Sequence, residues 1–218
     1  MPPLSPQHLL WLLVTTLFVA GCIGMQRPTL FVTVVLNETA WFLYRHYVVV
    51  VPLAHNLPLH LCDISVGLML MTLATDMNRL RELSYVAGTT GAIFAVSVPV
   101  ISESSDIRVV AEIRYLLTHI ALVGVGFYFT FGRKFHPGPM VVVRAYIAAH
   151  LYALVITPLN MALDTNYFFT LRAPNVDFLQ QHPHWLFLTA ASFAFLLCFG
   201  MMYVPFALLR TRTGVGEG

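Results

Sequence analysis

Seven apolar stretches, each long enough to cross a lipid bilayer, constrain the fold of this chain more than any other feature. A helix that crosses the hydrocarbon needs about 20 mainly apolar residues. The sequence therefore predicts an all-α, polytopic membrane helical bundle with seven transmembrane helices, at approximately 8–26, 29–51, 57–75, 82–101, 109–132, 140–161 and 184–209.

The composition is typical of a protein whose solvent is lipid. Hydrophobic residues make up 58% of the chain and charged residues only 10%, whereas soluble domains carry about a quarter charged residues. The formal net charge of +2 comes without a basic run, which excludes nucleic acid as a partner. We expect one membrane domain over residues 1–218. The cysteines show no paired spacing, so we expect no disulfide framework.

The Lys and Arg residues between the spans predict the orientation in the membrane. They are more numerous in the loops on the side of the C-terminus, and positively charged loops stay in the cytoplasm. We therefore expect the N-terminus outside and the C-terminus in the cytoplasm. The first span follows no positively charged segment, so we expect it to be retained rather than cleaved as a signal. On this topology the starts of spans three and five and the connector 162–183 meet on the outer side.

Polar and ionisable side chains inside the spans are the first candidates for function. Such residues are costly in hydrocarbon and generally face the interior of a bundle. Helical spacing places them on one face in each of spans two, five and six. We expect buried polar support from Glu38, Glu112, Tyr115 and Asn160, with Arg45 or a histidine as the partner of Glu38. The alternative is that these stripes, like Asn37, Tyr146 and Thr157, only form hydrogen bonds between helices.

Span three opens with His60, Cys62, Asp63 and Ser65, four groups able to donate, accept or attack. With Asn56 as the expected helix cap, Cys62 lies about one turn past the helix start. The positive end of the helix dipole favours a thiolate there, while burial in lipid disfavours it. Cys62 therefore needs a histidine base if it is to attack a substrate.

Two histidines are candidates for this base. His60 and Cys62 are about 200° apart around a helix, so they do not share one face. His119 lies in span five at a comparable depth, which favours His119 as the base. His60 would then support the site or lie on its oxyanion side, and His150 of span six is a further candidate for binding substrate or stabilising an oxyanion.

The connector 162–183 is rich in hydrogen-bonding and aromatic residues. Non-helical backbone near a membrane is stable only where it is buried in protein or faces water, and we interpret the connector as a lid over the outer mouth of the bundle. Asn166, Tyr167 and Arg172 are its candidates for holding a head group or stabilising an oxyanion. The alternative is a loop that anchors spans six and seven at the membrane interface.

Four segments resemble the YwaF-type integral membrane proteins of bacteria. They are Leu57-Pro-Leu-His-Leu-Cys-Asp-Ile-Ser65, Tyr115-Leu-Leu-Thr-His119, Pro158-Leu-Asn160 with Asp164-Thr-Asn-Tyr167, and Pro183-His-Trp185. A eukaryotic relative of that family is an ether-phospholipid acyltransferase with an essential cysteine in the first motif and a histidine two spans later. The resemblance implies those roles for Cys62 and His119, and a bacterial plasma membrane as the location. Asp63 departs from the pattern, where Asn is expected in many relatives.

Three functions remain open from the sequence. The first is an acyltransferase or transacylase that acts on phospholipids or lysophospholipids through Cys62, His119 and a thioester, without a cofactor or metal. With water as the acceptor, the same site is a lipase. The second is a zinc-dependent hydrolase, with ligands from His60, Asp63, His119 and His150. The third is a non-enzymatic protein that binds or transports lipid. The oligomeric state cannot be derived from the sequence.

Overall fold

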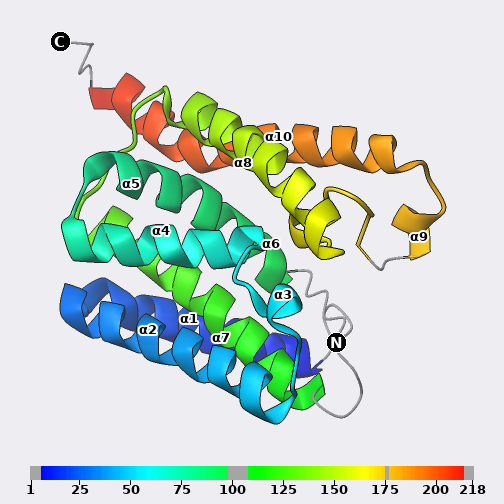
Figure 1. Cartoon of the computed structure of the whole chain (residues 1–218). Helices are drawn as coiled ribbons and strands as arrows, with labels where there is room; N and C mark the ends of the chain where they lie inside the picture. The colour runs from blue at the N-terminus through cyan, green and yellow to red at the C-terminus, as the bar shows by residue number, and fades with distance from the viewer. Residues whose placement is uncertain (1–5, 98–107, 175–176, 214–218) are drawn as a thin grey trace. The chain divides into compact units, whose positions relative to one another are not determined.

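The structure, a computed structural model, describes residues 6–97, 108–174 and 177–213. The fold is all-helical, with 83% helix and no strand among the described residues. They form two compact units, residues 1–135 and 136–218. Each unit is described by itself below, and Figure 1 shows the helices of both.

The first unit contains the longer run of helices. The two at its start are α1 (Pro6–Gly24) and α2 (Arg27–Leu43), and α2 continues as the π-helical turn η1 (Tyr44–Val48). A short α3 (Leu53–Asn56) precedes α4 (Leu61–Thr75). One continuous helical run then follows, made of α5 (Asn78–Leu83), the π-helical η2 (Ser84–Thr89) and α6 (Thr90–Ser97). The unit ends with α7 (Arg108–Phe127) and the π-helical η3 (Tyr128–Gly132).

Helix α7 is the centre of the first unit. It contacts α1, α2, α4, α6 and η2, and in Figure 1 it runs in green among α1, α2 and α4. Leu116 and Ile120 of α7 are buried and form a core cluster with Val96 of α6. The residues of α7 therefore meet side chains from every neighbouring helix, which makes it the natural place for a site shared between helices.

Two glycines allow close approach around η2. A Cβ on Gly126 of α7 would collide with the side chain of Thr89. A Cβ on Gly88 would lie 2.8 Å from the end of Met69 and 3.3 Å from Ser65 Cβ. Only glycine fits at these contacts without moving its neighbours, so η2 packs directly against both α4 and α7.

Asp76 closes the end of α4 in a left-handed conformation, with φ of 59°. Its carboxylate pairs with Arg81, with Arg133 at 2.9 Å and with Arg27 at 3.6 Å. Only the start of the charged stretch 76–82 is a turn, because α5 begins at Asn78. The single left-handed residue reverses the chain within a few residues, which leaves the rest of the charged stretch free to be helical.

The second unit is built on two long helices that lie side by side, α8 (Val141–Leu163) and α10 (His184–Thr213). Between them come the 3-10 turn η4 (Tyr167–Phe169) and the short α9 (Asp177–Gln180). Asn160, fully buried near the end of α8, organises this connection. Its side chain donates to Tyr167 O at 2.8 Å and to Thr170 Oγ1 at 2.9 Å, and it accepts from the Tyr167 N–H and the Thr165 hydroxyl.

Three helical runs among the described residues are long and apolar enough to cross a membrane, Val109–Gly132, Val141–Leu163 and His184–Leu208. They correspond to the fifth, sixth and seventh spans expected from the sequence. Shorter apolar helices occur at Leu9–Gly24 and Leu61–Thr75. The second expected span leaves regular α-helix after Leu43, and the end of the fourth lies outside the described residues, as does the polar loop 102–106. The all-helical prediction is confirmed, while seven spans, their orientation and a single domain stay predictions.

Candidate functional site

The start of α4 forms a tight helix cap around Cys62. The helix begins at Leu61, with His60 as its cap residue, and the Asp63 carboxylate accepts the His60 backbone N–H at 3.1 Å. The expectation that Asn56 caps this helix is wrong. Leu57 precedes Pro58 and is extended, with ψ of 140°, because a residue before proline is kept out of the helical region. Cys62 therefore lies in the first turn rather than one turn beyond it.

The Cys62 thiol is held near an acid rather than a base in this conformation. The side chain is partly buried, and Sγ lies 3.9 Å from Asp63 Oδ1. The first-turn N–H groups favour negative charge at Cys62, while the Asp63 carboxylate opposes it. The thiol is thus in its neutral form at rest, and a proton acceptor has to be present when it attacks.

A buried charge network joins α2, α4 and α7 beside this thiol. Arg114 of α7 pairs with Glu38 of α2 at 2.6 Å and with Asp63 of α4 at 3.6 Å. The Thr118 hydroxyl donates to Glu38 at 2.8 Å, and the Arg114 guanidinium lies 5.3 Å from the centre of the Trp41 ring. One cation serves two carboxylates here, so the network favours a neutral thiol at its edge.

The partner of Glu38 corrects the sequence interpretation. We expected Arg45 or a histidine, but the ion pair is with Arg114, and Asn37 Nδ2 donates to the same carboxylate at 2.9 Å. Arg45 instead donates to the His55 carbonyl at 3.4 Å. The reason is the packing of α2 against α7, which places Glu38 next to Arg114 and Thr118.

His119 is buried on α7, with 4% of its surface exposed. Its Nδ1 lies 2.6 Å from the Tyr115 carbonyl oxygen, and the two rings are 4.2 Å apart. A carbonyl oxygen only accepts hydrogen bonds, so Nδ1 carries the proton and Nε2 carries the lone pair. This is the tautomer that a general base needs.

Helix α4, which carries Cys62, packs against α7, which carries His119. Asp63 meets Arg114, while Ser65 and Leu122 both lie within 4 Å of a Cβ placed on Gly88. The first turns of α4 therefore lie against the part of α7 between residues 114 and 122. Among the hydrogen bonds of the described residues, none joins the thiol to the imidazole, since Sγ contacts Asp63 and His119 Nδ1 contacts Tyr115.

A small cavity lies next to this site, among α2, α4 and α7. Its volume is about 10 Å³, and Glu38, Val66 and Thr118 are among its lining residues. That is space for about one water molecule, which is too little for an acyl chain. In this conformation a lipid would have to part the helices, or arrive from another direction, to reach Cys62.

Ser65 and Glu112 are two further candidates in the first unit. Ser65 is buried, and its hydroxyl donates to the Leu61 carbonyl at 2.7 Å, one turn earlier in the helix. Glu112 is partly buried on α7, on the same face as Tyr115 and His119. Ser65 therefore supports the first turn of α4, and its hydroxyl is not directed at the Cys62 thiol.

The candidates in the second unit mostly hold its connecting segment together. Asn166 accepts the backbone N–H groups of Leu171 and Arg172 and donates to the Arg172 carbonyl. Tyr167 is buried against Asn160, whereas Arg172 is exposed. His150 contacts Ser192 of α10. Asn166 and Asn160 thus fix the backbone of the segment, and Arg172 is the member open to a ligand.

The zinc alternative finds no ligand set in the described part of the chain. No three His, Cys, Asp or Glu side chains lie close enough there to hold a metal ion. His182 and His184, which are two residues apart, also have backbone partners. His184 Nε2 contacts the Thr170 carbonyl and His182 Nδ1 contacts the Phe178 carbonyl.

Arg114, Thr118 and Ser192 are the site residues that the sequence interpretation missed. Arg114 and Thr118 are four residues apart in an apolar run, which is the spacing of one helical face. An arginine in such a run needs a buried carboxylate, and Glu38 was available as one. Nothing in the sequence singled out Ser192, since a single serine in an apolar helix ordinarily forms a hydrogen bond with a backbone carbonyl of its own helix.

Comparison with known proteins places the chain in a family. No curated protein and no solved structure matches it. A model of the TMEM164 family, a family of membrane proteins, matches residues 3–203, and the chain therefore belongs to the TMEM164 family.

Proposed function

We propose that this membrane protein transfers acyl chains between lipids, with Cys62 as the nucleophile and His119 as the base. The observation that carries the proposal is the placement of Cys62. Cys62 lies in the first turn of α4, and α4 packs against α7. His119 of α7 has Nδ1 toward the Tyr115 carbonyl, which leaves the lone pair on Nε2. The resemblance of 57–65 and 115–119 to the YwaF-type proteins and the ether-phospholipid acyltransferase supports the same two roles.

The first step requires the Cys62 side chain to turn from Asp63 toward α7. The thiol then passes its proton to His119 Nε2 as Sγ attacks the carbonyl carbon of a phospholipid ester. The tetrahedral intermediate collapses to a Cys62 thioester, and the leaving alkoxide takes the proton back from His119. In the second step His119 deprotonates the hydroxyl of a lysophospholipid, which attacks the thioester and releases the thiol.

The helix start itself offers donors for the oxyanion. The Ile64 N–H donates to the His60 carbonyl at 3.0 Å, which closes the first turn of α4. The N–H groups of Leu61 and Cys62 precede it, and such groups lack a partner inside their helix. They lie next to Sγ, where the oxyanion of the intermediate would form. With water in place of the lysophospholipid, the same steps give hydrolysis.

The test is to detect the thioester. The full chain is purified, reconstituted in bilayers of mixed phospholipids, and analysed by mass spectrometry of the intact protein and its peptides. We expect an acyl mass on the peptide with Cys62 that neutral hydroxylamine removes, because hydroxylamine cleaves thioesters. Cys62→Ala should abolish the adduct and His119→Gln should reduce it about a hundredfold.

The matched control is Cys198→Ala. Like Cys62, Cys198 is a partly buried thiol, but it lies on α10. It should leave the adduct and the transfer of labelled acyl chains unchanged. An adduct that persists in Cys62→Ala, or turnover that is normal in folded Cys62→Ala protein, would show that another residue carries the reaction.

A further inference from the structure

Three side chains in the second unit form a hydrogen-bonded chain that the Cys62 chemistry does not use. The Tyr146 hydroxyl of α8 lies 2.6 Å from Ser192 Oγ of α10. Ser192 Oγ lies 3.0 Å from Nε2 of His150, one turn beyond Tyr146 on α8. His150 Nδ1 lies 2.8 Å from the Tyr146 carbonyl oxygen, and its ring centre is 4.2 Å from that of Tyr146.

The backbone contact sets the direction of every proton in this chain. A carbonyl oxygen only accepts, so the neutral His150 ring carries its proton on Nδ1 and its lone pair on Nε2. Ser192 must then donate its single proton to Nε2. Tyr146 in turn donates to Ser192 Oγ. The serine hydroxyl is therefore directed at an imidazole lone pair, and a second hydrogen bond fixes the orientation of that imidazole.

This arrangement has the parts of an activated nucleophile. A nucleophilic serine needs a base within hydrogen-bond distance and a further group that orients the base. Here Ser192, His150 and the Tyr146 carbonyl hold those positions. A helix interior leaves no backbone N–H free to stabilise an oxyanion, but the Tyr146 hydroxyl is already 2.6 Å from the attacking oxygen.

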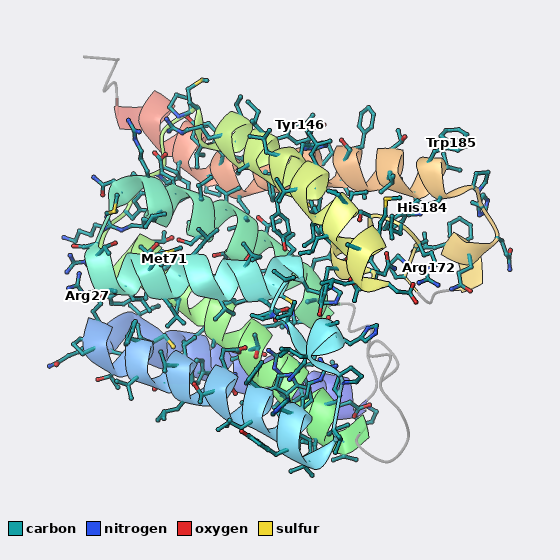
Figure 2. The ribbon with its side chains drawn as sticks, viewed as in Figure 1. Arg27, Met71, Tyr146, Arg172, His184 and Trp185 are labelled. Carbon is teal, nitrogen blue, oxygen red and sulfur yellow. The ribbon has the colours of Figure 1, made fainter. Side chains whose placement is uncertain are left out.

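The serine also borders a pocket. Its volume is about 320 Å³, and it is lined by Tyr146, Leu188, Thr189, Ser192, Phe193 and Leu196. This is within the size range of small-molecule sites, which are mainly apolar with a few polar groups. Leu188, Phe193 and Leu196 supply the apolar wall of the pocket. Tyr146, which also lines it, is labelled in Figure 2. An apolar chain that carries an ester group fits this combination.

We propose that Ser192 is a second nucleophile, which attacks carboxyl esters of apolar acyl chains with His150 as its base and Tyr146 as its oxyanion donor. The Oγ–carbonyl carbon bond forms as the Ser192 proton moves to His150 Nε2, and Tyr146 donates to the new oxyanion. The ester bond then breaks, and the leaving alcohol takes the proton from His150. Water, deprotonated by the same imidazole, then attacks the acyl carbon. The Oγ–acyl bond breaks, Ser192 Oγ takes the proton back from His150, and the acyl group leaves as a carboxylic acid.

A long-chain alkyl fluorophosphonate tests this directly on the full chain in bilayers. The Ser192 Oγ–phosphorus bond forms, the phosphorus–fluorine bond breaks, the proton goes to His150 and fluoride leaves. We expect a phosphonyl mass on the Ser192 peptide, with labelling slowed by an added excess of a monoacylglycerol that competes for the pocket. Ser192→Ala should remove the adduct, and His150→Gln should slow labelling about a hundredfold.

Two control variants show whether labelling depends on the Ser192–His150 pair alone. Thr157→Val changes a residue of α8 outside the pocket lining, whose hydroxyl donates to the Ala153 carbonyl at 2.6 Å, so its labelling rate should stay unchanged. Cys198→Ala should also leave the rate unchanged, because this thiol of α10 lies outside the pocket lining. Absence of any adduct on Ser192 in the folded wild-type protein would overturn the proposal, and so would equal labelling rates in His150→Gln and wild type. Either result would reduce the three side chains to a contact between α8 and α10.

Discussion

Replacing Asp63 with Asn should make the Cys62 thiol more reactive. Asp63 Oδ1 lies 3.9 Å from Cys62 Sγ, so a thiolate would form next to a carboxylate. Asparagine removes the charge but keeps an oxygen that can accept the His60 N–H, which leaves the cap of α4 in place. The substitution therefore changes electrostatics with little change in helix structure.

The size of the effect follows from the distance. Two unit charges 3.9 Å apart repel by about 4 kcal/mol at an effective dielectric constant of about 20. Arg114, 3.6 Å from the same carboxylate, offsets part of this repulsion. With about half of the repulsion remaining, Asp63→Asn stabilises the thiolate by about 2 kcal/mol. Since 1.36 kcal/mol is a factor of ten, the thiolate population rises more than tenfold.

The assay is the rate of alkylation by iodoacetamide at several pH values, followed by mass spectrometry of the Cys62 and Cys198 peptides. Only the thiolate reacts, so the Cys62 rate in Asp63→Asn should exceed the wild-type rate more than tenfold below the plateau at high pH. Cys198 is an internal control and should react at an unchanged rate. Asp63→Ala separates the two roles of Asp63, since it also loses the cap and should destabilise α4 by about 1 kcal/mol. An unchanged or slower Cys62 rate in folded Asp63→Asn protein would refute this account of the site.

Three further predictions concern the fold. Gly126→Ala should cost about 1–3 kcal/mol of unfolding free energy because its Cβ collides with Thr89, whereas Gly91→Ala, with no atom within 4 Å, should be neutral or stabilising in the same unfolding assay. Asn160→Ala removes the hub of the segment after α8 and leaves buried partners unpaired, so proteolysis of 164–172 should become at least tenfold faster. Asp76→Asn should cost about 1 kcal/mol, because the pairs with Arg27 and Arg133 are exposed and contribute little, Arg81 is the less exposed partner, and asparagine tolerates a positive φ, as thermal unfolding should show.

The sequence predicted the helices because apolar length alone requires them in lipid. It did not predict where they break. After Leu43 the helix α2 continues as the π-helical turn η1. In the fourth expected span, the π-helical η2 lies between α5 and α6 at Ser84–Thr89. Gly88 of η2 packs against α4 and Thr89 of η2 against α7, and contacts of this kind between helices are not part of any local sequence pattern. Pro58 explains why the helix does not begin before it, since the residue before a proline disfavours helix, but the start at Leu61 with His60 as its cap was not predicted.

The candidate site was predictable where one residue is unusual in its own segment. Cys62 near a helix start and His119 in an apolar run both stood out for this reason. The partner of Glu38 did not, because Arg114 lies 76 residues away and only the packing of α2 on α7 selects it over Arg45. Ser192 was missed since α10 is otherwise nearly free of polar side chains, and its meaning comes from His150 across the helix pair.

Charge balance in the first unit leads to a final prediction about Arg114. Its side chain is 16% exposed and pairs with Glu38, which is 22% exposed, and with Asp63, which is 13% exposed. Arg114→Met leaves two carboxylates without a cation, and breaking a buried pair in this way costs about 3–5 kcal/mol.

Adding Glu38→Gln to Arg114→Met should recover part of this cost, because one of the unpaired charges is then gone. In a double-mutant cycle measured by denaturant unfolding, the combined cost should be smaller than the sum of the single costs by about 1–3 kcal/mol. Costs that simply add would show that Arg114 and Glu38 contribute separately. In that case the 2.6 Å pair would not be what holds α2 against α7, and the position of Cys62 relative to His119 would depend on apolar packing alone.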